Sequence, residues 1–324
     1  MLIMLPSSPV NNVTPTLVPH GLMFHHFHGG IHKADKAGSL SQLQLEMVLD
    51  KVGIENILTP HDWLSAFLVN ELEPFHRCLT FDDALKSQID VALPVLQKYG
   101  LKAFWFIYSA PFHGEYPRLD LFRRFRYSYF DTIENYYHEF FKRFGSSSFQ
   151  SKASFEKWCK AISTTFPFYS ENDLRYRYIR DVLLRPTEYA AMVEEMISSK
   201  GLSLGELATN LWLTESDLRF LHANDHMLGL HSHDHPNSLS KLDKFQQRDQ
   251  YLKNTKFIRT LSNDPISMSH PCNSYNEETL KILAEMKIRV GFRSNMTKLN
   301  YIDSYYTNLQ LPREDAVNIL RQDS

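Results

Sequence analysis

The stretch Leu79-Thr80-Phe81-Asp82-Asp83-Ala84 places two adjacent carboxylates at the end of an apolar run that is typical of a buried strand. Neighbouring aspartates repel each other and lose hydration when buried, so such a pair usually binds a metal ion or shares a proton. Far downstream, the stretch His231-Ser232-His233-Asp234-His235 supplies imidazoles. A carboxylate and two imidazoles are a common ligand set for catalytic zinc. The two stretches together indicate an enzyme with a metal site.

Short apolar runs alternate with helical patterns over much of the chain. The predicted strands are residues 21–27, 78–82, 102–109, 227–231, 266–270 and, with a weaker pattern, 290–294. The predicted helices are residues 41–51, 84–99, 241–261 and 276–287, the last starting at a capping Asn276. This alternation predicts an α/β fold with a mostly parallel sheet, open or closed. The aspartate pair, His231, His235 and His270 all fall at strand ends, where such sheets gather functional groups.

Residues 112–225 interrupt the alternation and are predicted to be a helical insertion, which leaves 1–111 and 226–324 for the sheet domain. Helical patterns fall at 119–144, 154–164, 173–184, 187–199 and 215–223. Aromatic residues share helical faces in the first part of the insertion, namely Phe122, Phe125 and Tyr129, and then Tyr137, Phe141 and Phe144. These aromatics form either the core of a helical cap, or a wall that contacts sugar or lipid, or a dimer interface.

Composition limits the possible classes of function. The chain has 324 residues and a formal net charge of −2, so electrostatics give no reason to expect a nucleic-acid partner. Cys78, Cys159 and Cys272 have no paired spacing, which disfavours disulfides and a cysteine zinc site. No apolar run has the length of a membrane span. The first twenty residues lack a basic segment followed by an apolar one, so no signal peptide and a cytoplasmic location are expected.

Five motifs occur in the order of a known family. They are Gly21-Leu22-Met23-Phe24-His25, Thr80-Phe81-Asp82-Asp83, His231-Ser232-His233-Asp234-His235-Pro236, Ser269-His270-Pro271-Cys272-Asn273-Ser274-Tyr275-Asn276 and Leu311-Pro312-Arg313. This series resembles the polysaccharide deacetylases of the NodB-homology type, carbohydrate esterase family 4. The resemblance covers about 21–109 and 227–313 and skips the insertion. It implies a distorted (β/α) barrel with a large helical insertion, and a metal-dependent N- or O-deacetylase.

The resemblance also implies roles for individual residues. Asp83, His231 and His235 would bind a divalent metal, usually zinc, and Asp82 would be the general base. The alternative for the histidines is a hydrogen-bonded cluster on a surface loop. The backbone N–H of Cys272 would stabilise the oxyanion.

His233 and the Cys272 thiol lie in the same motifs, and each has an alternative interpretation. His233, which lies between the two ligand histidines, is expected to be structural. A rival hypothesis makes the Cys272 thiol a nucleophile beside His270, but that spacing matches no catalytic triad.

Departures from the family pattern leave the general acid open. Ala84 replaces the glycine that often follows the aspartate pair, which is tolerable where the backbone stays in an ordinary region. The sequence has no Leu-x-His motif with a proton-donating histidine, and Arg313 stands at the resembling position, where it stays protonated. Arg313 either orients Asp82, binds a substrate anion or lies on the surface before the last helix. The acid is then His25, His270 or protonated Asp82, and His25 is equally well a buried core residue.

These observations predict a hydrolase that removes an acetyl group from an N-acetylated sugar, in the assembly of a surface glycan or of a sugar precursor. Water activated by the metal would attack with Asp82 as base. One alternative is a catalytically silent carbohydrate-binding relative, although such a protein has little use for a base beside the metal ligand. Another alternative is a metal-dependent hydrolase of a different amide or ester.

Overall fold

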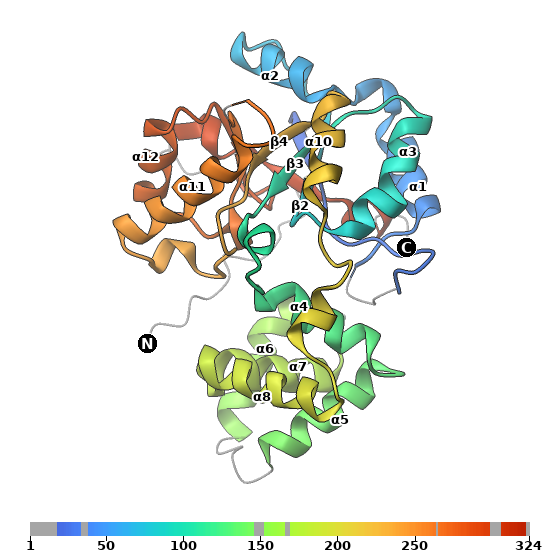
Figure 1. The fold of residues 1–324 in the computed structure, drawn as a ribbon, viewed down its shortest axis with the longest axis vertical. Helices are drawn as coiled ribbons and strands as arrows, with labels where there is room; N and C mark the ends of the chain where they lie inside the picture. The colour runs from blue at the N-terminus through green and yellow to red at the C-terminus, as the bar shows by residue number, and fades with distance from the viewer. Residues whose placement is uncertain are drawn as a thin grey trace. The chain divides into compact units, whose positions relative to one another are not determined.

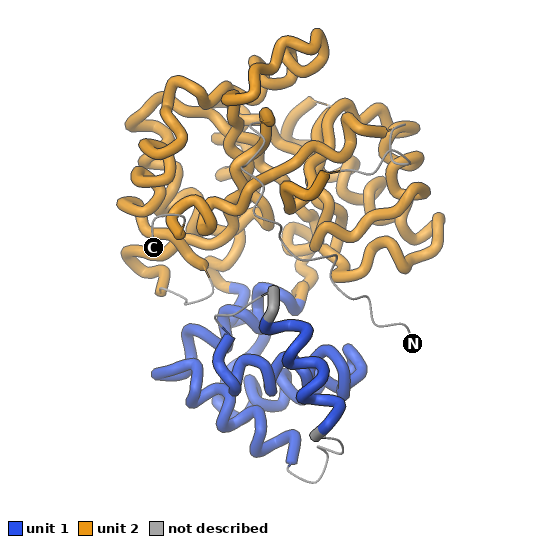
Figure 2. The backbone as a smooth tube through the Cα atoms, turned by 180° about the vertical axis from the view of Figure 1, so that it is seen from behind, with its two compact units in different colours: residues 1–16, 118–208 blue, residues 17–117, 209–324 orange. Residues whose placement is uncertain are grey.

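The computed structural model describes residues 18–33, 38–145, 152–165, 169–263, 265–298 and 306–321. Within these ranges the chain divides into two compact units (Figure 2). Unit 1 covers residues 118–208, and unit 2 covers the residues before and after that segment.

Unit 2 contains one sheet of seven parallel strands with helices around it (Figure 1). The strands are β1 (His20–Phe24), β2 (Arg77–Asp82), β3 (Ala103–Ile107), β4 (Met227–Leu230), β5 (Ser267–Ser269), β6 (Val290–Phe292) and β7 (Arg313–Asp315). Their order is β6-β5-β4-β3-β2-β1-β7, and every pair is parallel. A parallel bridge between Phe292 and Leu311 joins β6 to the segment that enters β7, so the sheet nearly closes on itself. The predicted distorted (β/α) barrel is confirmed.

The helices of unit 2 follow the strands. They are α1 (Gln42–Val52), α2 (Pro60–Leu68), α3 (Leu93–Lys98), α10 (Glu215–Ala223), α11 (Lys244–Ile258), α12 (Glu277–Glu285) and α13 (Ala316–Arg321). Asn276 caps α12 as predicted, because its side chain accepts the Thr279 N–H. The helix predicted to begin at residue 84 begins later, with a π-helical turn over Gln88–Ala92 that leads into α3. Asp83 and Ala84 have φ angles of 74° and 52°, which prevent a right-handed helix from starting there.

The alternation of side chains along β3 separates two apolar layers. Trp105 packs in the cluster that the strands share with helices α1, α3, α11 and α12, whereas Phe104 and Phe106 face the other way. This second face is the interior of the barrel, which Trp63 of α2 also lines. Asp82 pairs with Phe106 across β2 and β3 and therefore shares the interior face. The last carboxylate of β2 thus points into the barrel.

Unit 1 is helical. Its helices are α4 (Arg118–Ser128), α5 (Ile133–Phe144), α6 (Lys152–Thr165), α7 (Glu171–Tyr178), α8 (Pro186–Ser199) and α9 (Leu204–Ala208), with a π-helical turn at Ile179–Leu183 after α7. Of the six aromatic residues singled out from the sequence, Phe122, Phe125 and Tyr137 are buried in the core of this unit with Tyr136, Phe140 and Tyr176, whereas Tyr129, Phe141 and Phe144 are half-buried. The helical pattern predicted over 119–144 is two helices, since the chain breaks between α4 and α5. Helix α10, predicted with the insertion, packs on β4 in unit 2.

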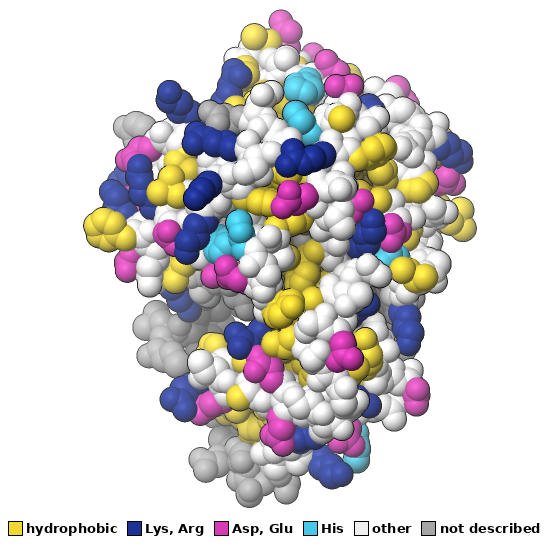
Figure 3. Space-filling model, in the orientation of Figure 1, with side chains coloured by type: hydrophobic (Ala, Val, Ile, Leu, Met, Phe, Trp, Pro, Cys, Tyr) yellow, Lys and Arg dark blue, Asp and Glu magenta, His cyan; other side chains and the backbone are white. Residues whose placement is uncertain are grey.

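The surface shows no segregation of charge on the face in Figure 3, where acidic and basic side chains are interspersed. Across the described ranges, no helix is both long enough and apolar enough to span a membrane. The interspersed charges on this face form no basic patch.

Candidate active site

Asp83, His231 and His235 meet at one edge of the sheet. Asp83 follows the last residue of β2, and His231 follows the last residue of β4; β3 lies between the two strands. Because parallel strands end at the same edge, the two loops converge there. The Nε2 atoms of the histidines are 3.1 Å apart, and each lies 3.3 Å from Asp83 Oδ1. All three residues are buried.

This triangle fits a zinc-sized cation. Ligand bonds of about 2.0–2.1 Å in tetrahedral geometry separate the donor atoms by about 3.3 Å. His231 Nδ1 lies 2.9 Å from the carbonyl of Ser269, which can only accept, so Nδ1 carries the proton and Nε2 keeps its lone pair when the ring is neutral. Asp83 Oδ1 is buried and has no hydrogen-bond donor among the described residues. Three electron-pair donors that face one another without a proton donor are stabilised by a cation.

The pKa values of these groups follow from burial and from one another. Burial opposes ionisation of Asp83, but His235 and His231 outweigh it and lower the pKa of its carboxyl. Burial also opposes the charged form of His231, yet the carboxylates of Asp82 and Asp83 raise its pKa. For His235, burial dominates and lowers the pKa to about 4. The ring of His235 is therefore neutral at pH 7, as a metal ligand must be.

Left-handed backbone is concentrated at the site. The φ angles of Asp83, Ala84, Ser232 and His235 are 74°, 52°, 65° and 54°, although none of these residues is a glycine. Residues in sparsely populated conformations cost about 1–3 kcal/mol each and cluster at functional sites. Ala84 thus occupies a conformation that favours the glycine of the family pattern. Alanine was expected to be tolerable only if the backbone stayed in an ordinary region, and the backbone does not.

Helix α11 holds the histidine loop in place. Asn254, which is fully buried, accepts the His231 N–H through Oδ1 at 2.9 Å and donates through Nδ2 to the carbonyl of Ile107 at 2.9 Å. Gln250 Oε1 accepts the N–H of His233. Neither side chain was singled out from the sequence, because a polar residue at the buried face of a helix has no local pattern that identifies its partner.

Asp82 is held by Arg313 inside the barrel. The guanidinium donates two hydrogen bonds of 2.7 Å to the two carboxylate oxygens. It also donates to Thr80 Oγ1 and Ser269 Oγ, and the Ser269 hydroxyl lies 3.1 Å from Asp82 Oδ2. Arg313 is 1% exposed, which excludes the alternative of a surface arginine. Gly21 makes room for it, since a Cβ there would lie 3.0 Å from Arg313 Cγ.

This ion pair decides the charge of Asp82. Burial alone would raise the pKa of the Asp82 carboxyl, but Arg313, His231 and His25 lower it below its usual value. Asp82 is therefore ionised at neutral pH and can accept a proton.

His25 and His270 differ in their access to this carboxylate. His25 follows β1, its Nε2 lies 3.7 Å from Asp82 Oδ2, and its side chain is 34% exposed. His270 is buried, its Nε2 contacts the carbonyl of Leu309 at 2.8 Å, and its ring stacks on Tyr275. Burial lowers the pKa of His270 to about 3. Of the two, His25 is the histidine that can reach both Asp82 and solvent.

Cys272 lies in the short turn η7 (Pro271–Asn273) after β5, with φ 49° and an exposed side chain. Its Sγ contacts Asn237 Oδ1 at 3.6 Å, next to the histidine loop. His270 Nδ1 has no hydrogen-bond partner within the described residues, so the thiol and this imidazole do not form a pair. His233 contacts Ser109 Oγ at 2.9 Å through Nδ1, which ties its ring to the end of β3.

Comparison with known proteins finds a match to one family model over part of the chain, and a shared fold. The family model for polysaccharide deacetylase matches residues 190–291, which include His231 and His235. No curated protein matches the chain. Among solved structures, the fold is similar to that of the Streptococcus pyogenes deacetylase PplD in complex with acetate, with TM-score 0.53 and 17% identity over 98% of this chain and 100% of that one.

Two further solved structures share the fold. IcaB from Ammonifex degensii has TM-score 0.52 and 11% identity over 92% of this chain and 91% of that one. A polysaccharide deacetylase from Bacillus cereus has TM-score 0.51 and 10% identity over 94% of this chain and 67% of that one. At these identities the likeness supports the fold, while the family match covers the histidine motif. The chain therefore shares the fold of solved deacetylases, and its residues 190–291 match the polysaccharide deacetylase family model.

Proposed function

We propose that the protein is a metal-dependent deacetylase that hydrolyses the acetamide of an N-acetylated sugar. The observation that carries the proposal is the buried triangle of Asp83, His231 and His235 beside an ionised Asp82. Asp83 and the two histidines would hold the divalent metal, of which zinc fits the ligand set best. When bound, the metal supplies a Lewis acid that polarises the acetyl carbonyl and acidifies water.

The residues around the triangle would then divide the proton transfers. Asp82 accepts the proton of the attacking water, and Arg313 fixes the orientation of its carboxylate through the two 2.7 Å hydrogen bonds. His25 is the group we propose as general acid for the leaving amine, because it lies near Asp82 and contacts solvent. The backbone N–H of Cys272 is proposed as the oxyanion donor.

The proposed substrate is an N-acetylated sugar of a surface glycan or of its precursors, and the proposed location is the cytoplasm. The family supports a carbohydrate substrate, and a Lewis-acid site with an adjacent base suits an amide. A catalytically silent binding protein would gain nothing from an ionised Asp82 that is fixed by a buried arginine.

Acetate release tests the proposal. A panel of N-acetylated sugars is incubated with the metal-loaded protein, with and without a chelator. We expect acetate release that the chelator abolishes, and a loss of at least about a hundredfold in Asp82→Asn, because general-base catalysis contributes about 10²–10⁴. Asp249→Asn, at an exposed position of α11, is the matched control and retains full activity. Equal activity in Asp82→Asn and the control would refute the role of Asp82.

Metal content tests the ligands independently of the reaction. His235→Ala and His231→Ala should lose stoichiometric metal by elemental analysis, whereas His233→Ala, whose ring contacts Ser109, should keep it. Stoichiometric metal in both ligand variants would refute the assignment. A protein that binds metal but releases no acetate from any sugar, and does release acid from another amide or ester, would support the alternative hydrolase.

A further inference from the structure

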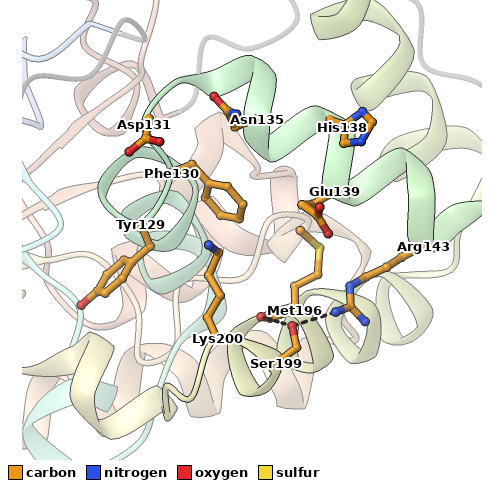
Figure 4. Close-up of a pocket in the computed structure, with 10 residues that line it drawn as sticks. All are labelled: Tyr129, Phe130, Asp131, Asn135, His138, Glu139, Arg143, Met196, Ser199 and Lys200. Atoms are coloured by element: carbon orange, nitrogen blue, oxygen red, sulfur yellow. Dashed lines mark hydrogen bonds between the residues drawn. The ribbon is translucent and has the colours of Figure 1, made fainter.

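Unit 1 contains a pocket that the proposed chemistry does not use. It has a volume of about 390 Å³ and is formed by the segment between α4 and α5, by α5 and by the end of α8 (Figure 4). Its lining includes Phe130, Asp131, Glu139, Met196 and Lys200. The volume lies in the range of small-molecule sites, roughly 300–1,000 Å³. We name it the α5 pocket.

Phe130 forms a fixed apolar surface in this pocket. Its ring packs edge-on against Phe125 at 5.2 Å and against Tyr136 at 5.3 Å between centroids, and both partners are fully buried. The ammonium of Lys200 lies 4.3 Å from the centroid of the Phe130 ring. In Figure 4 the Lys200 side chain extends toward Phe130 from the opposite side of the pocket. The aromatic ring is therefore anchored, whereas the lysine is a long side chain that can rearrange.

Polar side chains in the α5 pocket are uncommitted. Asp131, His138 and Glu139 make no hydrogen bond or ion pair with another described residue, and Lys200 contacts only the Phe130 ring. Elsewhere in unit 1, several carboxylates form ion pairs, as in Glu194 with Arg118, Glu195 with Arg143, Glu188 with Arg185, and Asp181 with Arg180. Free donors and acceptors are thus gathered in the hollow, where a ligand could satisfy them.

The charges of the pocket select the class of ligand. Asp131 and Glu139 share the pocket with Lys200 and with Arg143, which is itself paired with Glu195, so the lining has no excess of positive charge and disfavours a strongly anionic ligand. The many polar groups disfavour a lipid chain, whose burial would leave them unpaired. A saccharide is neutral, offers hydroxyls that both donate and accept, and has an apolar face that suits Phe130 and Met196.

We infer that the α5 pocket is a second saccharide-binding site, built from residues other than those of the proposed active site. The choice of a saccharide as the ligand rests on the proposed function. The pocket and its uncommitted side chains are observed independently of that function. Carboxylates bind sugar hydroxyls strongly, since hydrogen bonds to charged groups are worth about 1.5–3 kcal/mol each. Glu139 and Lys200 are therefore the side chains expected to contribute most to affinity, with Phe130 as the platform.

Hydrogen exchange on the full chain locates the binding. An N-acetylglucosamine trisaccharide is the probe, and exchange is followed by mass spectrometry with and without it. We expect slower exchange in peptides that cover 129–143 and 196–200, and the same peptides should be unaffected by glycerol at equal concentration. Slower exchange confined to peptides of unit 2, or in none, would overturn the inference.

Affinity measured by calorimetry provides the second test. Glu139→Gln should weaken binding of the trisaccharide in the α5 pocket about tenfold or more. Glu156→Gln, at an exposed position of α6 in the same unit, is the matched control and should not change it. Phe130→Ala should also weaken binding. If Phe130→Ala does not fold, Lys200→Met, which does not touch the core, is measured in its place and should weaken binding. Affinities equal to that of the unmodified protein in Glu139→Gln and Lys200→Met would overturn the inference.

The two proposals fail separately. Acetate release without protection of the 129–143 peptides would leave the proposed activity intact and remove the second site. Protection of these peptides in a protein that releases no acetate would support the second site and remove the proposed activity.

Discussion

Replacing Arg313 by methionine should destabilise unit 2 in a pH-dependent way. Arg313 is 1% exposed and supplies both guanidinium hydrogen bonds to Asp82, which is itself 1% exposed. In Arg313→Met, the carboxylate keeps the Ser269 hydroxyl, at 3.1 Å, as its hydrogen-bond donor. Removing one partner of a buried ion pair costs about 3–5 kcal/mol, because an uncompensated charge remains. We expect a loss of that size in the free energy of unfolding at pH 8.

The sign of the pH dependence follows from the pKa of Asp82. In the unmodified protein this pKa lies below the ordinary value of 3.8, so the ionised carboxylate stabilises the fold above that pH and the contribution is lost as pH falls. In Arg313→Met, the effect of burial is no longer outweighed by the guanidinium, and the pKa rises above 3.8. Ionisation then destabilises the variant as pH rises. The difference between the two proteins is therefore largest at pH 8 and shrinks toward pH 5.

Urea unfolding followed by tryptophan fluorescence measures this difference. Trp63, Trp105 and Trp212 lie in unit 2, so Trp158→Phe in every protein confines the signal to that unit. The double variant Asp82→Asn/Arg313→Met is the control: it should recover more than half of the loss and show no added pH dependence. A chelator is present throughout. A loss below about 1 kcal/mol at pH 8, or an equal loss at pH 5 and pH 8, would refute the reasoning.

Three further changes probe the same unit. Ala84→Gly should raise stability by about 0.5–1 kcal/mol and the melting temperature by a few degrees, because φ is 52° there; an unchanged melting temperature would contradict the assigned backbone. Asn254→Ala should cost about 1–3 kcal/mol in urea unfolding, since the N–H of His231 and the Ile107 carbonyl each lose a buried partner and keep only their 3.2 Å hydrogen bond to each other, and it should lower metal affinity about tenfold or more by titration; no change in either would refute its positioning role. Burial lowers the pKa of His226 to about 4, and its ring accepts the indole N–H of Trp105, so protonation favours unfolding. Stability should therefore fall by about 3 kcal/mol between pH 6.5 and pH 4, and His226→Gln should flatten this slope, whereas an unaltered slope would assign it to other groups.

Much of the fold follows from local pattern. The strands near Cys78 and Met227 are short, apolar and bounded by polar residues, and both were predicted within one or two residues of their observed ends. The polar residues that cap α1 and α12 mark their starts. Strand β7 was not predicted, because its three residues are charged and become a strand only by pairing with β1.

The three residues proposed as metal ligands could be predicted from the sequence, but the side chains that hold them in place could not. Asp83, His231 and His235 were recognised because unusual residue types occur at strand ends in the order of the family motifs. Asn254 was not recognised, since a buried asparagine within a helix has no local feature that reveals which backbone groups it bonds. The π-helical turn before α3 was missed for a related reason: it follows from the left-handed backbone at Ala84.

The sequence by itself predicted the type of fold, and its residue types indicated a metal site of one carboxylate and two imidazoles with a neighbouring aspartate as the proposed base. These depend on the period of side chains along a strand and on residue chemistry, both of which are local. Only the tertiary structure decided what Arg313 does. It lies 231 positions from Asp82 in the chain, and the two side chains meet because β7 pairs with β1 and the sheet nearly closes around them. That closure excludes water from both charges and turns an arginine with three possible roles into the partner that keeps Asp82 ionised.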